Sequence, residues 1–218
     1  MTHRPFRFGT GAYEAASAAV YREQVLRIES QGYSVIGGPD HFGRELAAGP
    51  MLTAAALIAP SVRVCCTVYD NDFRHPALLA KEAASIDVLS DGRVDVGIGA
   101  GWIKWEYDRI GMSFDAPGVR VARMQEAVHI LKGLWADGPF SFTGRHYTID
   151  ALDGWPKPVQ RPGPPIFIGA GGRRMLEFAA CEADIIGILA PALPEGGLDT
   201  GADSEERLAR QVGWVRDA

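Results

Sequence analysis

The chain has 218 residues, of which 47% are hydrophobic and 22% charged, and its formal net charge is −5. This balance is typical of a globular protein, and the acidic charge argues against nucleic-acid binding, which needs a basic surface. No apolar run reaches ~18 residues, so no membrane span is expected, and the amino terminus lacks the apolar segment of a secretory signal.

The chain has three cysteines, and two of them, Cys65 and Cys66, are adjacent. An odd number without regular spacing argues against a disulfide framework and favours a reducing, cytoplasmic compartment. The sequence contains no C-x-x-C, H-x-x-x-H or H-E-x-x-H motif, so no metal site is predicted. We interpret Cys65 and Cys66 as inert thiols within a buried strand.

Short apolar runs alternate with segments of helical periodicity along the chain. In chain order they predict strand 6–9, helix 15–31, strand 34–37, helix 50–59, strand 62–68, helix 76–89, strand 94–98, helix 119–136, strand 166–168, helix 174–182, strand 185–189 and helix 204–216. Gly32 is expected to end the first helix and Pro50 to stand near the start of the second. Ser204 is the expected N-cap of the last helix.

One excursion, residues 137–165, interrupts this alternation. Aromatic and polar residues alternate around Gly144 in 140–149, which predicts a small hairpin. A proline-rich stretch then returns the chain in extended form. We interpret 137–165 as an insertion into the repeating pattern.

Alternating strands and helices predict a parallel sheet, either doubly wound or closed as a (β/α)8 barrel. Polar or glycine-rich residues follow most of the strands, and this spread favours the barrel, whose sites are built from many βα loops. Only six strands are found, whereas a barrel typically needs ~250 residues. We therefore predict one α/β domain, 1–218, a TIM (β/α)8-type barrel truncated after about six strands. It would be a truncated product, a fragment, or a form completed by oligomerisation.

Asp40 and His41 follow the second predicted strand. Histidine titrates near neutral pH, so His41 can exchange a proton with a bound ring or donate a hydrogen bond to it. The alternative is a loop pair that bonds only local backbone, and position alone leaves both interpretations open.

Two glycine-rich segments follow later strands. Residues 97–102 (GIGAGW) admit a flat ligand or a phosphate, although Trp102 stands where a dinucleotide fingerprint needs its third glycine. Glu106, four residues on, reads as an ordinary surface or first-turn carboxylate. Residues 169–174 (GAGGRR) lead into a helix, and their free backbone N–H groups, the helix dipole and two arginines predict a phosphate site. The alternative there is a tight turn with exposed arginines.

The segment from Thr67 to Pro76 follows the third predicted strand. It either lines a pocket or caps the next helix, with Arg74 tied to a neighbouring carboxylate. The sequence pattern leaves the two open.

These motifs, taken in order over residues 6–190, resemble the luciferase-like monooxygenase superfamily, and most closely its members that use the deazaflavin coenzyme F420. The motifs are PDHF (39–42), FRHP (73–76), LAKE (79–82), DVLSDGRV (87–94), GIGAGW (97–102) with Glu106, RMQEA (123–127), LW (134–135), Gly144, PKPVQ (156–160) and PIFIG (165–169).

The resemblance implies a TIM barrel that binds F420, or alternatively FMN, at the carboxyl ends of its strands. Asp40 and His41 would be catalytic residues facing the ring, and Thr67 and Val68 would form a bulge, often a non-proline cis peptide, behind it. The remaining cofactor-binding residues would be Gly99, Gly101 and Trp102 near the ring and Gly169, Gly171, Gly172 and Arg173 at the phosphate.

The resemblance further implies hydride transfer between F420 and an unidentified small organic substrate. The alternatives are an FMN-dependent monooxygenase and a barrel that binds the cofactor without catalysis. Trp102 stands where sugar-phosphate dehydrogenases of the superfamily carry a catalytic glutamate, which argues against oxidation of glucose 6-phosphate. A homodimer is one candidate assembly.

Overall fold

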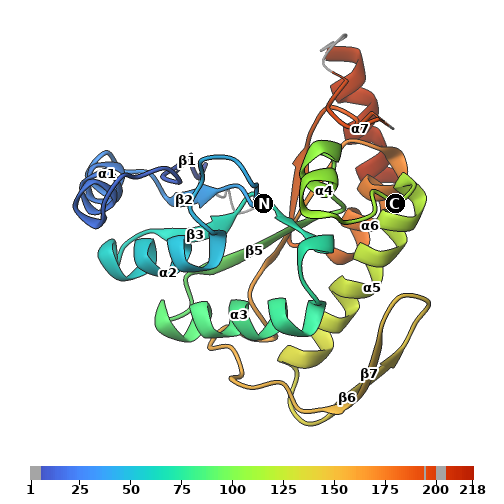
Figure 1. Ribbon diagram of the computed structural model, residues 1–218, viewed down its shortest axis with the longest axis horizontal. Coiled ribbons are helices and arrows are strands. Elements are labelled where there is room, and N and C mark those ends of the chain that lie inside the picture. Colours follow the sequence, from blue (N-terminus) through green and yellow to red (C-terminus); the bar gives the residue numbers. More distant parts are fainter. Residues whose placement is uncertain (1–5, 194, 200–204) are drawn as a thin grey trace.

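The computed structural model describes residues 6–193, 195–199 and 205–218, and a parallel sheet forms its centre (Figure 1). The order of strands across the sheet is β1 (Gly9–Gly11), β2 (Val35–Gly38), β3 (Arg63–Cys66), β5 (Val94–Gly99), β8 (Ile166–Ala170) and β9 (Ile185–Ile188). A short strand, β4 (Tyr69–Asp70), also pairs with β5. The predicted α/β fold is confirmed, with six parallel strands arranged as a half-barrel.

All neighbouring strands of this sheet run parallel. Their carboxyl ends therefore lie at one edge of the sheet. This edge, with the loops that leave Gly38, Cys66, Gly99 and Ala170, is termed the rim.

The helices return the chain between strands, and their ends follow local chemistry. Ser17 caps the first helix by accepting a hydrogen bond from the Val20 N–H, and Gly32 follows its end with a φ of +81°. Pro76 and Pro117 stand at first helical positions, where a missing N–H costs nothing. The helices are α1 (Ala18–Ser30), α2 (Ala48–Ile58), α3 (Pro76–Leu89), α4 (Lys104–Ile110), α5 (Pro117–Trp135), α6 (Arg173–Glu182) and α7 (Glu205–Asp217), with a 3₁₀ turn, η1 (Asn71–Phe73).

The predicted hairpin is confirmed as β6 (Phe140–Thr143) and β7 (Thr148–Leu152), and it turns back beside α5 in Figure 1. Glu126 on α5 holds its turn by accepting hydrogen bonds from the backbone N–H groups of residues 145, 146 and 147. In the described part of the chain, no helix is long and apolar enough to cross a membrane.

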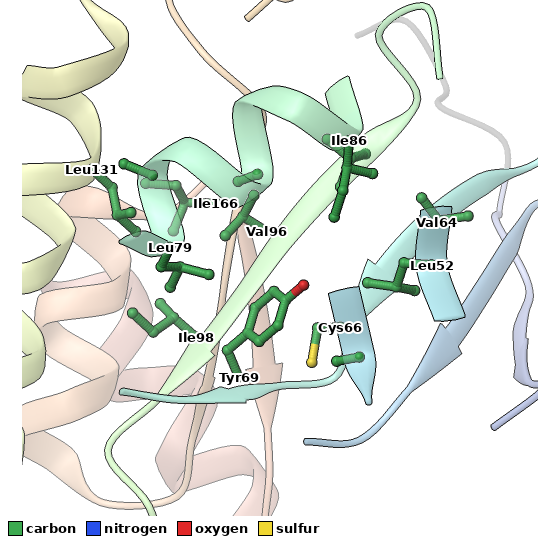
Figure 2. Packing of buried hydrophobic residues seen from close by; sticks show 14 of the residues in the cluster. Leu52, Val64, Cys66, Tyr69, Leu79, Ile86, Val96, Ile98, Leu131 and Ile166 are labelled. Atoms are coloured by element: carbon green, nitrogen blue, oxygen red, sulfur yellow. The ribbon is translucent and has the colours of Figure 1, made fainter. Parts of the chain in front are cut away.

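The hydrophobic core lies between the sheet and its helices (Figure 2). Alternate residues of a strand point to one face, so Val64 and Cys66 of β3 and Val96 and Ile98 of β5 meet the helices. The helices contribute Leu52, Leu79 and Leu131, all almost fully buried. Cys65 and Cys66 are both buried, and burial raises the pKa of the Cys65 thiol to about 12, which agrees with inert thiols.

On the opposite, inner face of the sheet, the inward positions of β5 change from a charged residue at the base to glycine at the rim. Near the base, Asp95 of β5 binds Arg63 at 2.6 Å. Two residues on, Gly97 lies under the Phe167 ring, which also crosses Gly187 of β9. Two residues further, at the rim, β5 ends with a second inward glycine, Gly99.

Two sequence-based predictions about the fold are wrong. The first strand is Gly9–Gly11 rather than 6–9. Phe6 and Phe8 are 83% and 67% exposed, so they do not belong to a buried strand. The Phe8 carbonyl accepts hydrogen bonds from the N–H groups of Ser34 and Val35, just before the strand pairing begins. The helix α4 was not predicted, since its seven residues are too few for a periodic pattern. The predicted Ser204 cap lies outside the described residues.

Gly97 tests the packing of the inner face. A Cβ at this position would overlap the Cys66 carbonyl oxygen, which is backbone and cannot turn aside. We expect Gly97→Ala to lower the free energy of unfolding by about 1–3 kcal/mol in urea. Gly213→Ala is the control, because a Cβ there meets no atom within 4 Å, and it should raise stability by about 0.5–1 kcal/mol. A Gly97→Ala protein as stable as the wild type would contradict this packing.

Candidate cofactor-binding site

Most of the predicted site residues, from Asp40 to Arg173, lie at the rim, because each stands at or just after the carboxyl end of a strand of the same parallel sheet. Contacts join these loops across it. The Asp70 N–H donates to Asp40, and Leu189 contacts the position of a Gly169 Cβ at 3.5 Å. Gln211 of α7 donates to the carbonyls of Gly171 and Leu189 at 2.8 Å each. The rim is thus one continuous surface from β2 to α7.

The peptide bond between Thr67 and Val68 is cis, as the resemblance implied. The Thr67 N–H donates to the Gly38 carbonyl at 2.8 Å, which ties this bulge to β2. The Val68 side chain lies between two glycines of neighbouring strands. Its Cγ2 is 2.7 Å from the position of a Gly99 Cβ, and its Cγ1 is 3.4 Å from that of Gly169. Any side chain at position 99 would therefore displace Val68.

Asp40 is engaged on both carboxylate oxygens. Arg74 donates to Oδ2 at 2.7 Å and to Oδ1 at 2.8 Å, a bidentate pair, and the Asp70 N–H donates to Oδ2. Burial opposes the charge of Arg74, but the hydrogen bonds and charge of Asp40 outweigh it and raise the pKa of Arg74 above its ordinary value. These contacts give Asp40 a role in holding the loop, and its predicted catalytic role stays a prediction.

His41 is held by Glu106, which the sequence suggested to be a surface or first-turn carboxylate. Glu106 does stand in the first turn of α4, but it is not on the surface: it is only 1% exposed, because α4 turns it inward beside Tyr107. Its Oε2 lies 3.0 Å from Nδ1 of His41, and its Oε1 accepts the Phe42 N–H at 2.6 Å. The Trp102 ring lies edge-on to the His41 ring, with centroids 6.0 Å apart.

Gly101 is required by internal packing, because a Cβ there would overlap the Tyr107 hydroxyl and lie 2.6 Å from Asp70 Oδ2. Its role in cofactor binding stays a prediction. The Tyr107 hydroxyl donates to Asp70 at 2.8 Å. Burial raises the pKa of Asp70 to about 6, and hydrogen bonds from the Asp72 N–H and Tyr107 offset only part of this rise.

The start of α6 carries the predicted phosphate residues. A Cβ on Gly172, its N-cap residue, would meet nothing within 4 Å, so the approach to the helix start is open. Gly171 instead packs against the chain, since its Cβ would lie 2.5 Å from the Ala190 carbonyl oxygen. The Arg173 side chain is 67% exposed, and its Nε pairs with Glu177 at 2.7 Å. Arg174 turns away and donates to Gln125 of α5.

One cavity of the structure lies at the rim, and another lies away from it. One of about 310 Å³ lies at the rim between the end of β9 and α7, with Leu189 and Gln211 in its wall. The other, of about 190 Å³, lies between α3, α5 and residues 152–156, away from the carboxyl ends of the strands. In the described residues, no group of three or more His, Cys, Asp or Glu side chains could hold a metal ion.

Arg74, Asp70 and Glu106 are charged residues of the site to which the sequence assigned no role. The sequence placed Arg74 near a carboxylate without identifying it, and it gave no burial signal for Glu106 because α4 was not predicted. The available signal was the place of Glu106 beside GIGAGW (97–102) among the motifs of the resemblance.

Comparison with known proteins gives a consistent family. The sequence profile of luciferase-like monooxygenases matches residues 2–213. The FMNH2-dependent dimethylsulfone monooxygenase of Pseudomonas putida is 38% identical over 109 residues, which are 50% of this chain and 30% of that protein. The F420-dependent glucose-6-phosphate dehydrogenase of Kineococcus radiotolerans is 28% identical over 207 residues, 86% of this chain and 60% of that protein.

Solved structures show the same fold. Monooxygenase RslO1 from Streptomyces bottropensis superposes with a TM-score of 0.79 at 24% identity, covering 97% of this chain and 65% of that one. An F420-dependent secondary alcohol dehydrogenase superposes with a TM-score of 0.74 at 25% identity, covering 83% of this chain and 57% of that one. The chain thus spans less than two thirds of each of these relatives.

Asp70 predicts a pH dependence of stability. Its pKa is about 6 in the folded chain against an ordinary value of 3.8, so the folded state binds more protons between these values. The free energy of unfolding contributed by Asp70 therefore falls as pH rises from about 4 to about 6, by roughly 3 kcal/mol in all. Asp70→Asn removes this term and keeps an acceptor for Tyr107.

We expect Asp70→Asn to gain stability relative to the wild type between about pH 4 and about pH 7, measured by urea unfolding at each pH. Asp108→Asn, on the exposed face of α4, should show no such change. An equal stability difference for Asp70→Asn at both pH values would contradict the raised pKa.

Proposed function

Because the chain belongs to the luciferase-like monooxygenase family, we propose that it is an oxidoreductase that binds a flavin or a deazaflavin at the rim. The observation that carries this proposal is the Thr67–Val68 bulge seated between Gly99 and Gly169. It places a small apolar surface, with glycine on both sides, at the carboxyl ends of the central strands. A planar ring needs such a flat backing that no long side chain crosses.

The residues at the rim fit such a cofactor. Thr67 and Val68 would back the ring, and Gly99 and Gly169 keep that surface low. The open N-terminus of α6 at Gly172 suits the negatively charged tail of the cofactor, because backbone N–H groups and the helix dipole favour an anion there. Arg173 would add charge if it exchanges Glu177 for phosphate.

The bound cofactor would supply two-electron transfer, and the chain would supply binding, orientation and proton handling. His41 is the ionisable side chain best placed for the last of these, since its ring stands beside Trp102 at the rim and is partly exposed. Asp40 and Arg74 would fix the loop that carries His41.

Two cofactors are candidates, and different relatives favour each. F420 with hydride transfer to or from a small organic substrate is our first candidate, because the F420-dependent relative aligns over 86% of this chain. FMN with monooxygenase chemistry is the second, because the relative with 38% identity is FMNH2-dependent. A chain that binds either cofactor and never turns over would instead be a cofactor-binding protein.

Titration of the purified chain with F420 and, separately, with FMN tests this proposal, with fluorescence of the cofactor as the readout. We expect saturable binding of one of the two. We also expect Arg173→Ala to weaken that binding by roughly tenfold, since a charge-assisted contact to phosphate is lost. Arg174→Ala is the matched control, because Arg174 already donates to Gly118 and Gln125 and should bind as the wild type does.

The outcomes separate the parts of the proposal. Binding of neither cofactor would contradict it. Binding of FMN alone would replace the F420 assignment with the FMN one. Equal affinity of Arg173→Ala and the wild type would remove Arg173 from the site and leave the phosphate to the backbone of α6.

A further inference from the structure

Glu106 is a buried carboxylate whose two oxygens both serve the loop after β2. It comes from α4, 65 residues further along the chain than His41. One oxygen lies 3.0 Å from His41 Nδ1, and the other accepts the Phe42 N–H at 2.6 Å. Removing a carboxylate from water is costly, so a buried one is retained where its partners compensate for the lost hydration.

An ionised carboxylate only accepts hydrogen bonds, so the proton between these groups belongs to Nδ1 of His41. In a neutral imidazole the other nitrogen, Nε2, is then an acceptor without a proton. The Phe42 contact fixes the Glu106 carboxylate in place, and the Trp102 ring bounds the His41 ring on another side, at 6.0 Å between centroids. With Glu106 ionised, these contacts favour the Nδ1–H tautomer and hold the orientation of the ring.

We propose that Glu106 is the positioning residue of His41, which holds Nδ1–H and leaves Nε2 as the atom that exchanges a proton at the rim. This inference rests on the proposed function, because that function gives His41 a bound partner. When Nε2 takes a proton from a donor, the donor–hydrogen bond breaks and an N–H bond forms. The imidazolium charge then lies against Glu106, and release of the proton restores the neutral ring.

Asp40 does not fill this role, although it precedes His41 in the sequence. Its carboxylate is engaged by the fork of Arg74 and by the Asp70 N–H. The two carboxylates therefore divide the work: Asp40 holds the loop to β4, and Glu106 acts on the imidazole itself.

Glu106→Gln tests the inference, since it keeps the shape and removes one acceptor. The amide has one oxygen for two donors, His41 Nδ1–H and the Phe42 N–H, so its NH₂ group must face one of them. The Phe42 N–H can only donate, whereas the imidazole can move its proton, so the oxygen stays with Phe42. The NH₂ group then donates to Nδ1, and the proton of His41 moves to Nε2. Asp108→Asn is the control, because it removes a carboxylate from the same helix on its exposed side.

The readout is the ¹⁵N NMR spectrum of histidine-labelled protein without cofactor, with His41 assigned by a His41→Gln variant. We expect the Nδ1–H tautomer in the wild type and in Asp108→Asn, and the Nε2–H tautomer in Glu106→Gln. An Nε2–H tautomer in the wild type overturns the inference, and this holds even if Glu106→Gln fails to fold. An unchanged tautomer in a folded Glu106→Gln protein also overturns it.

Steady-state kinetics with the cofactor that binds add a second readout. We expect Glu106→Gln to lower kcat by roughly 10- to 100-fold and to change KM little, because the residue acts on proton transfer and not on binding. A rise in KM with kcat unchanged overturns the positioning role. A wild-type chain that shows the Nδ1–H tautomer but no turnover counts against the proposed function and leaves the placement of the His41 proton standing.

Discussion

The arrangement of the site depends on a constraint of space on the inner face of the sheet. Along β5 the residues that point inward are Asp95, Gly97 and Gly99, so the side chains disappear as the strand approaches the rim. Backbone from β3 occupies the space beside Gly97, and Val68 occupies the space beside Gly99. The bulge after β3 can lie across the central strands only because these positions carry no Cβ, and this bulge is the surface on which the proposed ring would rest.

The loops around this surface are held by buried charge. Arg74, which follows the bulge and η1, forms an ion pair with Asp40 in the loop after β2. Glu106 binds His41 of the same loop and so connects it to α4. A third pair, Arg123 with Asp72, ties η1 to α5 at 2.8 Å. Each pair links segments that are far apart in sequence, and removing the partner of Glu106 or Asp72 would leave a buried carboxylate without compensation. The rim is therefore held in place before any ligand arrives, as binding sites generally require.

Much of this could be predicted from the sequence. Helices such as Pro76–Leu89 have long apolar patterns and clear first and last residues, so their bounds were predicted closely. The strand that follows Phe8 was misplaced, because aromatic residues usually mark buried strands, whereas here Phe6 and Phe8 are exposed. The side of the sheet on which Asp40, His41 and the glycines gather follows from strand order alone, since parallel strands share a rim.

Side-chain contacts between segments that are far apart in the chain could not be predicted from the sequence. Nothing in the local pattern connects Glu106 with His41 or identifies Asp40 as the partner of Arg74, because these contacts depend on how loops of different βα units approach one another. Gly101 shows the same limit: its motif suggested the approach of a ligand, and the structure adds that a side chain there would meet Tyr107 and Asp70. A glycine in a motif indicates that a side chain is excluded, and only the structure shows what excludes it.

A crystal structure of the chain with the cofactor that it binds tests the central claim most directly. The account predicts a planar ring in contact with Val68 and within reach of His41, with the phosphate at Gly172. A ring bound elsewhere, such as in the cavity beside Trp155 between α3 and α5, would contradict it.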